Sequence, residues 1–367
     1  MPSSKNKKKV LVLASTFPRW VEDTNPPFVF DLCRGLTKTM DITVLAPHYP
    51  GAKDDEIMSG LKVHRFHYFF SKWEKLAGNG GILPVLKSNK FYYLLVPFFL
   101  LAEIIATIKL VNKLKPDTIH AHWIIPQGLA AYINFLVNKT PYIVTSHGGD
   151  IFGLQGKLLT QLKKLILENA KSITVVSSAI KNEILKINPK LESKIEIIPM
   201  GVDTKLFNPN KYDQKLKERY GITGPFLLFV GRLVEKKGVR YLIEAMPAIL
   251  KKHPKTKLLI IGSGPLENEL KSLSSSLKVD SNIVFTGAIK HSDLPPYFAT
   301  ADIFIAPSIQ TDDGDTEGYG LTIAEATASE CKVIATNIGG IGDIIRKEDL
   351  IRSTSTSAIS KRVINLL

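Results

Sequence analysis

Short apolar runs rich in β-branched residues alternate with helical patterns along the whole chain of 367 residues. A repeat of strand, helix and strand builds parallel sheets with helices on both faces, so this rhythm restricts the chain to an α/β fold. The runs are almost continuously apolar, as strands buried on both faces are. Helical patterns such as 158–168 and 239–250 lie between them. The predicted strands are 10–14, 42–46, 63–69, 118–121, 142–145, 173–176, 195–198, 226–230, 258–261, 283–286, 303–306 and 333–335.

So many strands exceed what one ordinary doubly wound sheet holds, and the chain length also suits two domains. We therefore predict two Rossmann-like, doubly wound domains that face each other across a cleft. The segment between the strands 195–198 and 226–230 is rich in proline and glycine, and the boundary is placed near 199–203. The N-terminal domain is predicted to span residues 1–200 and the C-terminal domain residues 201–367. Ligands of such sheets bind beyond the carboxyl ends of the strands, so residues that follow strands are the candidates for function.

Positive charge is concentrated in the first half of the chain. The net charge is +14, and residues 1–200 hold 26 Lys and Arg against 15 Asp and Glu. Residues 201–367 hold 22 against 19. This asymmetry is typical either of a solvated basic surface or of a first domain that faces an anionic membrane surface or a phosphorylated acceptor. The chain has no aromatic and basic motif of a nucleic-acid reader, so no nucleic-acid partner is expected.

The cysteines and one apolar segment bear on the compartment. Cys33 and Cys331 are too few for a disulfide framework and predict a reducing compartment. We expect a cytoplasmic chain, either free or peripheral at the inner face of the membrane. The apolar segment 91–102 is shorter than the roughly 20 residues of a spanning helix, and Pro97 and Glu103 interrupt its pattern. It is predicted as a buried helix of the first domain, with an interfacial helix as the alternative.

Two glutamates, Glu317 and Glu325, flank a Gly-Tyr-Gly-Leu-Thr turn. The turn predicts the start of a helix, where the amides of Gly320, Leu321 and Thr322 would form an anion site. Glu317 would lie in the loop before this helix, and Glu325 one to two turns inside it. Amides suit a phosphate and carboxylates suit sugar hydroxyls, so the pattern favours a ligand that carries both groups.

Basic residues and glycines follow the strands predicted at 226–230 and 258–261. Arg232 offers a planar fork and Lys237 a point charge, and the two can converge on one diphosphate. An exposed basic turn is the alternative interpretation. The Gly262-Ser-Gly264 turn indicates close packing of the backbone near a ligand.

Histidines follow two predicted strands of the first half. His147 precedes a Gly-Gly-Asp turn, which favours a functional role, whereas His122 suits a structural role equally well. The histidine and cysteine spacings show no metal-binding pattern, and no metal site is expected. The chain has neither a P-loop nor a Gly-x-Ser-x-Gly nucleophile motif.

Together, these ordered motifs resemble those of the retaining GT-B glycosyltransferases of family 4, the glycosyl transferases group 1. The resemblance covers nearly the whole chain. It implies that the first domain binds an acceptor and the second binds a nucleotide sugar such as a UDP- or GDP-sugar. It also implies that no cofactor or metal is required, because basic residues and helix amides take the metal's place at the diphosphate. The segments that carry it are 198–203, 231–238, 283–287, 301–308, 317–326 and 333–340.

The resemblance implies roles for the phosphate-binding residues. Arg232 and Lys237 would hold the donor phosphates, and the amides of Gly320, Leu321 and Thr322 would cap them. Charge builds on the departing diphosphate during glycosyl transfer, and these groups would stabilise it there.

The remaining implied roles concern the sugar and the nucleoside. Glu317 would bind hydroxyls of the transferred sugar, and His147 would reach that sugar near the reacting carbon. Glu325 would bind the ribose, and Ile289 would flank the base. Retention would follow from attack on the same face, with the leaving phosphate accepting the acceptor's proton, so no carboxylate nucleophile is expected.

The sequence analysis thus predicts a retaining, metal-independent glycosyltransferase of the hexosyltransferase type, active in polysaccharide biosynthesis. Its acceptor would be a glycan, a lipid-linked glycan or a small molecule. The alternative is a catalytically impaired or partner-dependent nucleotide-sugar-binding protein. That alternative comes from the 24 residues that follow Asp343, because the family continues there with a further strand and a longer final helix.

Overall fold

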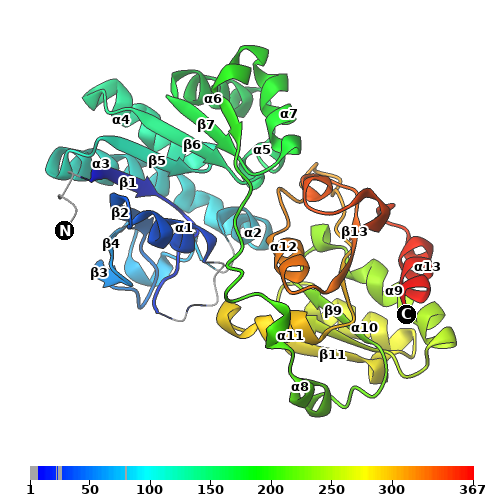
Figure 1. Cartoon of the computed structure of the whole chain (residues 1–367). Coiled ribbons are helices and arrows are strands. Elements are labelled where there is room, and N and C mark those ends of the chain that lie inside the picture. The colour runs from blue at the N-terminus through cyan, green and yellow to red at the C-terminus, as the bar shows by residue number, and fades with distance from the viewer. Residues whose placement is uncertain (1–6, 22, 24–26, 79–80) are drawn as a thin grey trace. The chain divides into compact units, whose positions relative to one another are not determined.

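The structure of the protein is a computed structural model that describes residues 7–21, 23, 27–78 and 81–367. The chain divides into two compact units, Met1–Ile198 and Pro199–Leu367. The division lies two residues before the predicted one, at the start of the segment 199–203. Each unit is a mostly parallel sheet covered by helices (Figure 1). The predicted α/β class and the two Rossmann-like units are therefore confirmed.

The sheet of the first unit has eight strands within the described residues, in the order β3-β4-β2-β1-β5-β6-β7-β8. Neighbouring strands are parallel, except that β3 pairs antiparallel with β4. Strand β3 escaped prediction because it is a short edge strand that begins with two acidic residues. The strand order reverses between β1 and β5, which makes that point the topological switch. The strands are β1 Lys8–Leu13, β2 Met40–Pro47, β3 Asp55–Met58, β4 Leu61–Phe66, β5 Thr118–His122, β6 Tyr142–Ser146, β7 Ser172–Val175 and β8 Ile195–Ile197.

Helices pack on this sheet, whose central strands are buried: Leu11, Val12 and Ile119 have no exposed surface. The helix predicted at 158–168 is α6, one residue longer at each end. The helical elements used below are α1 Phe28–Leu36, η1 Ser71–Trp73, α2 Ile82–Ser88, η2 Lys90–Leu95, α3 Val96–Leu114, α4 Leu129–Asn138, α5 Gly149–Phe152, α6 Lys157–Asn169 and α7 Ser178–Ile187.

Helix α3 has polar residues on its buried side and apolar residues on its exposed side. Glu103 and Thr107 are buried, and Glu103 Oε1 accepts a hydrogen bond from Gln127 Nε2 at 3.0 Å. On the opposite side, Phe98 and Leu101 are 51% and 58% exposed. The prediction of a buried helix is therefore wrong for one side of α3. Glu103, close in sequence to Phe98 and Leu101, turns inward because Gln127 offers it a partner there.

The length and composition of η2 and α3 also satisfy the requirements of a membrane span. Lys90–Leu114 is long and apolar enough to cross a bilayer, a test that core helices of soluble proteins pass as well, and 33% of its most apolar window is buried. Composition alone thus does not decide its environment. The exposed apolar side of α3 is instead the observation that indicates an interaction surface, because such a patch is unfavourable in contact with water.

The sheet of the second unit has six strands in the described residues, in the order β11-β10-β9-β12-β13-β14, all parallel. Strand β14 lies beyond the last predicted strand, 333–335, and was not predicted. It has only two residues and pairs with the end of β13, so no apolar run announces it. The strands are β9 Phe226–Val230, β10 Lys257–Ile261, β11 Ile283–Gly287, β12 Ile303–Ala306, β13 Lys332–Thr336 and β14 Leu350–Ile351.

Two apolar cores, one on each face, hold this sheet between its helices. Along β9, alternate residues enter opposite cores: Leu227 packs into one and Leu228 into the other. The predicted helix 239–250 is α9, which continues to Lys252. The helical elements are α8 Gln214–Arg219, η6 Glu235–Lys237, α9 Val239–Lys252, α10 Glu267–Ser276, η8 His291–Asp293, α11 Pro295–Thr300, α12 Leu321–Ala328 and α13 Thr356–Leu366.

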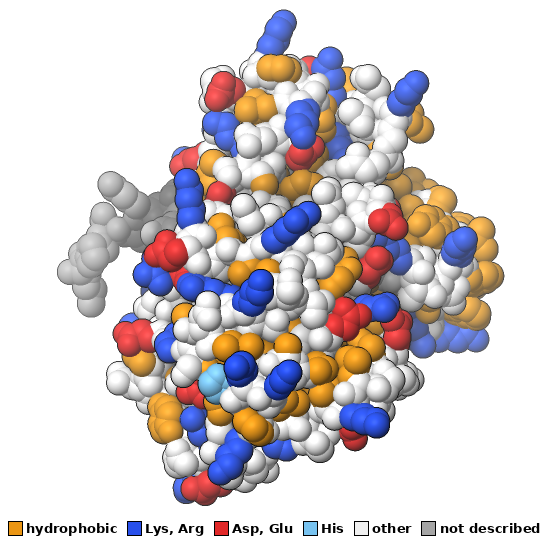
Figure 2. Space-filling model, turned by 90° about the vertical axis from the view of Figure 1, so that its right-hand side faces the viewer, with side chains coloured by type: hydrophobic (Ala, Val, Ile, Leu, Met, Phe, Trp, Pro, Cys, Tyr) orange, Lys and Arg blue, Asp and Glu red, His pale blue; other side chains and the backbone are white. Residues whose placement is uncertain are grey.

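Basic side chains are distributed over the surface rather than gathered at one point of the face drawn in space-filling form (Figure 2). Lysines and arginines stand there among hydrophobic and acidic side chains.

Candidate functional site

In the second unit, the predicted site residues meet at the topological switch point of the sheet. Strand β9 is the first strand of the unit, and it lies between β10 on one side and β12 on the other. Arg232 and Lys237 follow β9, and Glu317 lies in the loop that follows β12. The carboxyl ends of parallel neighbours share one edge, so the strand order brings these loops together.

Four charged side chains form two ion pairs in these loops. Lys237 Nζ donates to Glu317 Oε2, and Lys236 Nζ lies 3.1 Å from Asp315 Oδ1. The side chains are between 14% and 19% exposed. Burial acts to raise the pKa of Glu317, but the charges of Lys237 and Lys236 outweigh it, so the pKa is lowered. Glu317 is consequently an ionised acceptor at neutral pH.

The guanidinium of Arg232 lies in the same group. Burial lowers the pKa of Arg232 from its ordinary value, while Glu317 and Asp315 act to raise it, and an arginine stays charged in any such setting. Its Nη1 is buried and has no hydrogen-bond partner among the described residues. A buried donor without an acceptor is costly, so this arrangement suits the binding of an anionic oxygen.

Glycines hold the loops of this site in close backbone contact. Gly238, after the lysines, has φ +62°, and a Cβ placed there would lie 1.9 Å from the carbonyl oxygen of Pro307 at the end of β12. A Cβ on Gly262 would lie 1.9 Å from the carbonyl oxygen of Gly231. The close backbone packing predicted for the Gly262-Ser-Gly264 turn is confirmed. It fixes the path of the loop that carries Arg232.

Helix α12 begins where the sequence predicts. Gly320 is its N-cap with φ +102°, and the helix proper starts at Leu321. The amides of Gly320, Leu321 and Thr322 belong to the end of a helix at which the backbone has no intrahelical acceptors, so they can bind an anion. As predicted, Glu317 lies before the helix and Glu325 lies inside it.

Glu325 has a partner that the sequence analysis missed. Its side chain is 2% exposed, and its Oε1 lies 2.6 Å from His291 Nε2. His291 opens η8 shortly after β11, close in sequence to Ile289, which packs against the core. The sequence signal for His291 was its position four residues after the end of β11. The predicted roles of Glu325 at a ribose and of Ile289 at a base stay predictions.

In the first unit, the histidines of β5 and the histidine just after β6 come together. These strands are parallel neighbours, with His122 in register with Thr145. His122 Nδ1 lies 2.9 Å from His147 Nε2, and their rings stack at 5.2 Å between centroids. His120 Nε2 lies 2.7 Å from Thr145 Oγ1 on the same pair of strands.

Burial keeps this histidine group neutral. It lowers the pKa of His120 to about 4 and that of His147 to about 3, and the pKa of His122 is held well below its ordinary value by burial and by the other two histidines. His122 Nε2 and His147 Nδ1 are buried without a hydrogen-bond partner in the described part of the chain. At neutral pH, His147 can therefore donate or accept a hydrogen bond but does not act as a cation.

Asp150 and Trp123 are further residues of this site, and neither was predicted. Asp150 Oδ2 accepts from the amide of Ile124 at 2.7 Å, and Oδ1 accepts from Ser146 Oγ at 2.8 Å. One buried carboxylate thus joins the turns after β5 and β6. Trp123 has φ +80°, a strained conformation for a side chain of this size, and its ring lies 4.9 Å from that of His147. The Gly-Gly-Asp turn after His147 was the sequence signal.

Two family models match consecutive parts of the chain. Residues 213–367 match the model described as glycosyl transferases group 1. Residues 27–206 match the model described as glycosyltransferase family 4. The two matches fall on the two structural units.

Curated relatives are glycosyltransferases. An uncharacterized glycosyltransferase of Methanocaldococcus jannaschii is 27% identical over 317 residues, which are 83% of this chain and 79% of the relative. A GDP-mannose-dependent α-(1-6)-phosphatidylinositol monomannoside mannosyltransferase of Mycolicibacterium smegmatis is 35% identical over 179 residues, 47% of either chain. The match thus spans most of the first relative and about half of the second.

Solved structures share the fold. Sucrose-phosphate synthase from Thermosynechococcus elongatus has a TM-score of 0.74 at 18% identity, covering 98% of this chain and 90% of that one. The Anabaena protein HepE in complex with UDP and glucose has a TM-score of 0.71 at 16% identity, covering 98% and 89%. The alternative of a catalytically impaired or partner-dependent binding protein finds no support in these comparisons.

Proposed function

The chain belongs to the family 4 glycosyltransferases, the glycosyl transferases group 1, and from this premise we propose that it moves a hexose from a nucleotide sugar to an acceptor with retention of configuration. The donor binds to the second unit, between the loops after β9 and β12. The acceptor is a glycan carried by a lipid, and the reaction needs no metal ion at the diphosphate.

The observation that carries this proposal is the buried Arg232 guanidinium with its unpaired Nη1, in the same unit as the first turn of α12. Arg232, Lys236 and Lys237 supply three positive charges against the two carboxylates of Asp315 and Glu317. The negative charge of a diphosphate would balance this excess of positive charge, and the amides at the start of α12 can bind the phosphate oxygens. These same groups stabilise the charge that develops on the departing diphosphate, which is the work a metal ion does in other transferases.

Glu317 and His147 form hydrogen bonds with the transferred sugar. The ionised Glu317 accepts hydrogen bonds from sugar hydroxyls, and the ion pair with Lys237 orients its carboxylate. His147, neutral by burial, offers a hydrogen bond without placing a positive charge near the oxocarbenium-like transition state. Glu325 binds the ribose through a carboxylate that His291 orients. The leaving phosphate accepts the proton of the acceptor hydroxyl.

Calorimetric titration with UDP, GDP and ADP tests the donor site. We expect saturable binding of one of them, and Arg232→Ala should weaken it about 10- to 100-fold, as loss of a charged hydrogen bond does. Arg240→Ala is the matched control, because Arg240 is an exposed arginine of the same unit that pairs with Glu244. Equal affinity in Arg232→Ala and the wild type would contradict the site. GDP-mannose is the first donor to try, because it is the donor named for the mycobacterial relative.

A lipid-linked acceptor requires that the first unit bind a membrane surface, and we place that surface on the exposed side of α3. The exposed aromatic residues continue from α3 onto the loop at η1: the rings of Phe69 and Phe98 lie 5.4 Å apart, and those of Trp73 and Phe91 lie 6.3 Å apart. We call this surface the apolar face. It consists of Phe69, Phe70, Trp73, Phe91, Tyr93, Leu94, Phe98, Leu101 and Ile105.

The charges around the apolar face favour an anionic bilayer. All seven lysines in residues 71–115 are exposed, whereas the two glutamates of this segment are buried. The segment that carries most of the apolar face therefore has exposed lysines and, among its described residues, no exposed acidic side chain. Interfacial segments combine these features, since aromatic rings enter the headgroup region while lysines meet anionic lipid.

Co-sedimentation with vesicles tests the apolar face. We expect the chain to bind vesicles of phosphatidylglycerol and phosphatidylcholine more tightly than phosphatidylcholine alone, with binding that weakens as salt rises. The double substitution Phe98→Ser and Leu101→Ser should lower partitioning by about tenfold or more, because two exposed side chains no longer leave water. Leu158→Ser is the control, since Leu158 is 83% exposed on α6 of the same unit. Equal loss in the control, or no binding to either vesicle, would contradict the assignment.

A further inference from the structure

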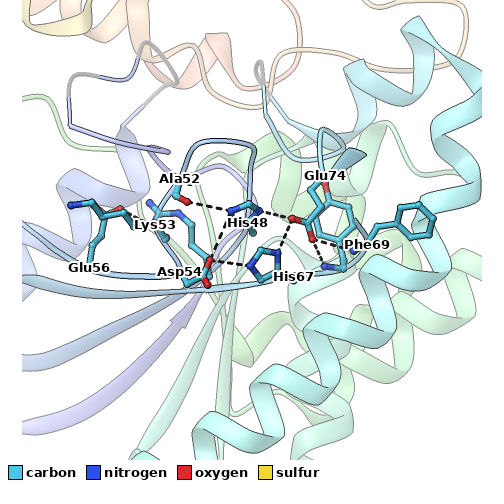
Figure 3. A network of polar contacts seen from close by, with 10 residues as sticks. His48, Ala52, Lys53, Asp54, Glu56, His67, Phe69 and Glu74 are labelled. Carbon is cyan, nitrogen blue, oxygen red and sulfur yellow. Dashed lines mark hydrogen bonds and ion pairs between the residues drawn. The ribbon is translucent and has the colours of Figure 1, made fainter. Parts of the chain in front are cut away.

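Two histidines of the first unit lie side by side at the carboxyl ends of neighbouring strands. Strands β2 and β4 are parallel, with Pro47 in register with Phe66, so the next residues, His48 and His67, are neighbours as well. Their ring centroids lie 4.0 Å apart. Figure 3 shows the two imidazoles between the carboxylates of Asp54 and Glu74. Strand β1 separates this pair from His120 and His122 of β5 and from His147 after β6.

Glu74 points one carboxylate oxygen at both rings. It has no exposed surface, and its Oε1 accepts hydrogen bonds from the amides of Tyr68 and Phe69 at 2.6 and 3.1 Å. Its Oε2 contacts His48 Nδ1 and lies 2.9 Å from His67 Nδ1. The orientation of the carboxylate is thus set by the backbone, and Oε2 is the atom directed at the histidines (Figure 3).

The other ring nitrogens face acceptors. His67 Nε2 lies 2.9 Å from Asp54 Oδ1, and His48 Nε2 lies 3.2 Å from the carbonyl oxygen of Ala52. A carbonyl oxygen only accepts, so His48 carries a proton on Nε2, and a carboxylate favours the same tautomer in His67. In the neutral rings, both Nδ1 lone pairs then point toward the lone pairs of Glu74 Oε2. Three lone pairs directed at one position suit a cation there, either a proton or a metal ion.

We propose that this cluster is a zinc site with His48 Nδ1, His67 Nδ1 and Glu74 Oε2 as its protein ligands. The three side chains offer ligand atoms that all lie within 4.8 Å of one another, which a small opening adjusts to tetrahedral binding. Two imidazoles and one carboxylate are a ligand set that Zn²⁺ accepts, with the fourth position left for water. Asp54 and Ala52 hold the outer nitrogens, as the hydrogen-bond partners of zinc-bound histidines do.

A bound metal ion would connect the loop 67–74 to His48 at the carboxyl end of β2. That loop includes η1, with Trp73, and also Phe69 and Phe70, all members of the apolar face. The site is structural by this reasoning, and none of its ligands is among the residues assigned to the donor. The sequence analysis expected no metal because the ligands of this site follow no short motif. His67 comes 19 residues after His48, and Glu74 comes 7 residues after His67.

The test is a calorimetric titration of the full-length chain with Zn²⁺ after treatment with a chelator. We expect one Zn²⁺ per chain, with affinity lower by about tenfold or more in His67→Gln and in Glu74→Gln, as loss of one ligand implies. His64→Gln is the matched control, because His64 lies on β4, the strand just before His67, and also pairs with a carboxylate, that of Asp55. Mg²⁺, which prefers oxygen ligands, should not bind.

Two further measurements keep the outcome decisive. Circular dichroism of each variant verifies folding, and His67→Gln serves if Glu74→Gln does not fold, because the His67 side chain is 42% exposed. Replacement of Zn²⁺ by Co²⁺ should produce the visible absorption of a four-coordinate ion in the wild type and not in His67→Gln. The absence of saturable Zn²⁺ binding would overturn the proposal and leave protons as the cations of this cluster. Binding of equal strength in folded His67→Gln would overturn it as well.

Discussion

At the residue scale, burial assigns different charge states to the groups of the candidate site. Glu317 is ionised because two lysines outweigh its burial, whereas His122 of β5 and His147 after β6 are neutral because burial lowers the pKa of both. Ionised acceptors suit sugar hydroxyls, and neutral rings suit the vicinity of a positive transition state. The chemistry proposed for Glu317 and His147 follows from these surroundings rather than from residue type alone.

The neutral histidines predict that the first unit loses stability in acid. Their pKa values are lowered on folding, to about 4 for His120 and about 3 for His147, so below pH 6.5 the unfolded chain binds more protons than the folded chain. The free energy of unfolding should therefore fall as pH decreases from about 6.5 to about 4, by up to about 1.4 kcal/mol per pH unit for each histidine that titrates. Urea unfolding at several pH values measures this slope.

His120→Gln separates this effect from other acid-linked groups. Glutamine retains a hydrogen-bonding group near Thr145 Oγ1 but does not titrate, so the slope should become shallower. A slope identical to that of the wild type would show that His120 is not one of the groups responsible.

At the scale of elements, the candidate site depends on how closely neighbouring strand ends approach. The loop after β9 meets the end of β12 at Gly238, and Gly262 after β10 meets that loop at Gly231, and in both places a Cβ has no room. These contacts hold Arg232 and Lys237 at the switch point of the sheet. Helix α12 follows the loop that carries Glu317, and the amides of its first turn also belong to the candidate site.

Gly238→Ala should disturb both stability and nucleotide binding. A left-handed backbone alone costs an alanine about 1–2 kcal/mol, and the clash with Pro307 adds about 1–3 kcal/mol. Gly221→Ala is the matched control, because Gly221 has φ +60° and nothing lies within 4 Å of the position that its added methyl group would take. Thermal unfolding and nucleotide titration of both variants measure the difference. Equal destabilisation, with nucleotide affinity retained in both, would contradict the role given to this contact.

At the scale of the whole molecule, each unit has its own sheet and its own buried core. All residues assigned to the donor except His147 belong to the second unit. The apolar face, the neutral histidines and the proposed zinc ligands belong to the first. Donor binding and membrane binding are thus assigned to separately folded parts of one chain.

This division predicts that the fragment 199–367 folds and binds the donor nucleotide alone. Its affinity for the nucleotide should lie within about tenfold of that of the full chain, a difference of about 1.4 kcal/mol, because His147 is assigned to the sugar and every residue assigned to the nucleotide is in the fragment. Calorimetric titration of the fragment with the nucleotide that binds the full chain measures it. A folded fragment without affinity would show that the first unit supplies part of the nucleotide site.

The sequence alone determined the fold class, the central strands and the start of α12. Parallel strands buried on both faces need continuous apolar runs, and a helix start needs a local turn, so both leave a signal within a few residues. The same locality explains why these site residues could be named, since Arg232 and Lys237 follow a recognisable strand and Glu317 adjoins the glycine turn that starts α12.

Only the tertiary structure decided the edge strands β3 and β14, the pairing of His291 with Glu325, the exposed side of α3 and the cluster of His48, His67 and Glu74. Edge strands bury little and so need no apolar run. The other features join residues far apart in the chain, or depend on which side of a helix meets a neighbour. Strand order and packing decide such contacts, and the local pattern of residues encodes neither.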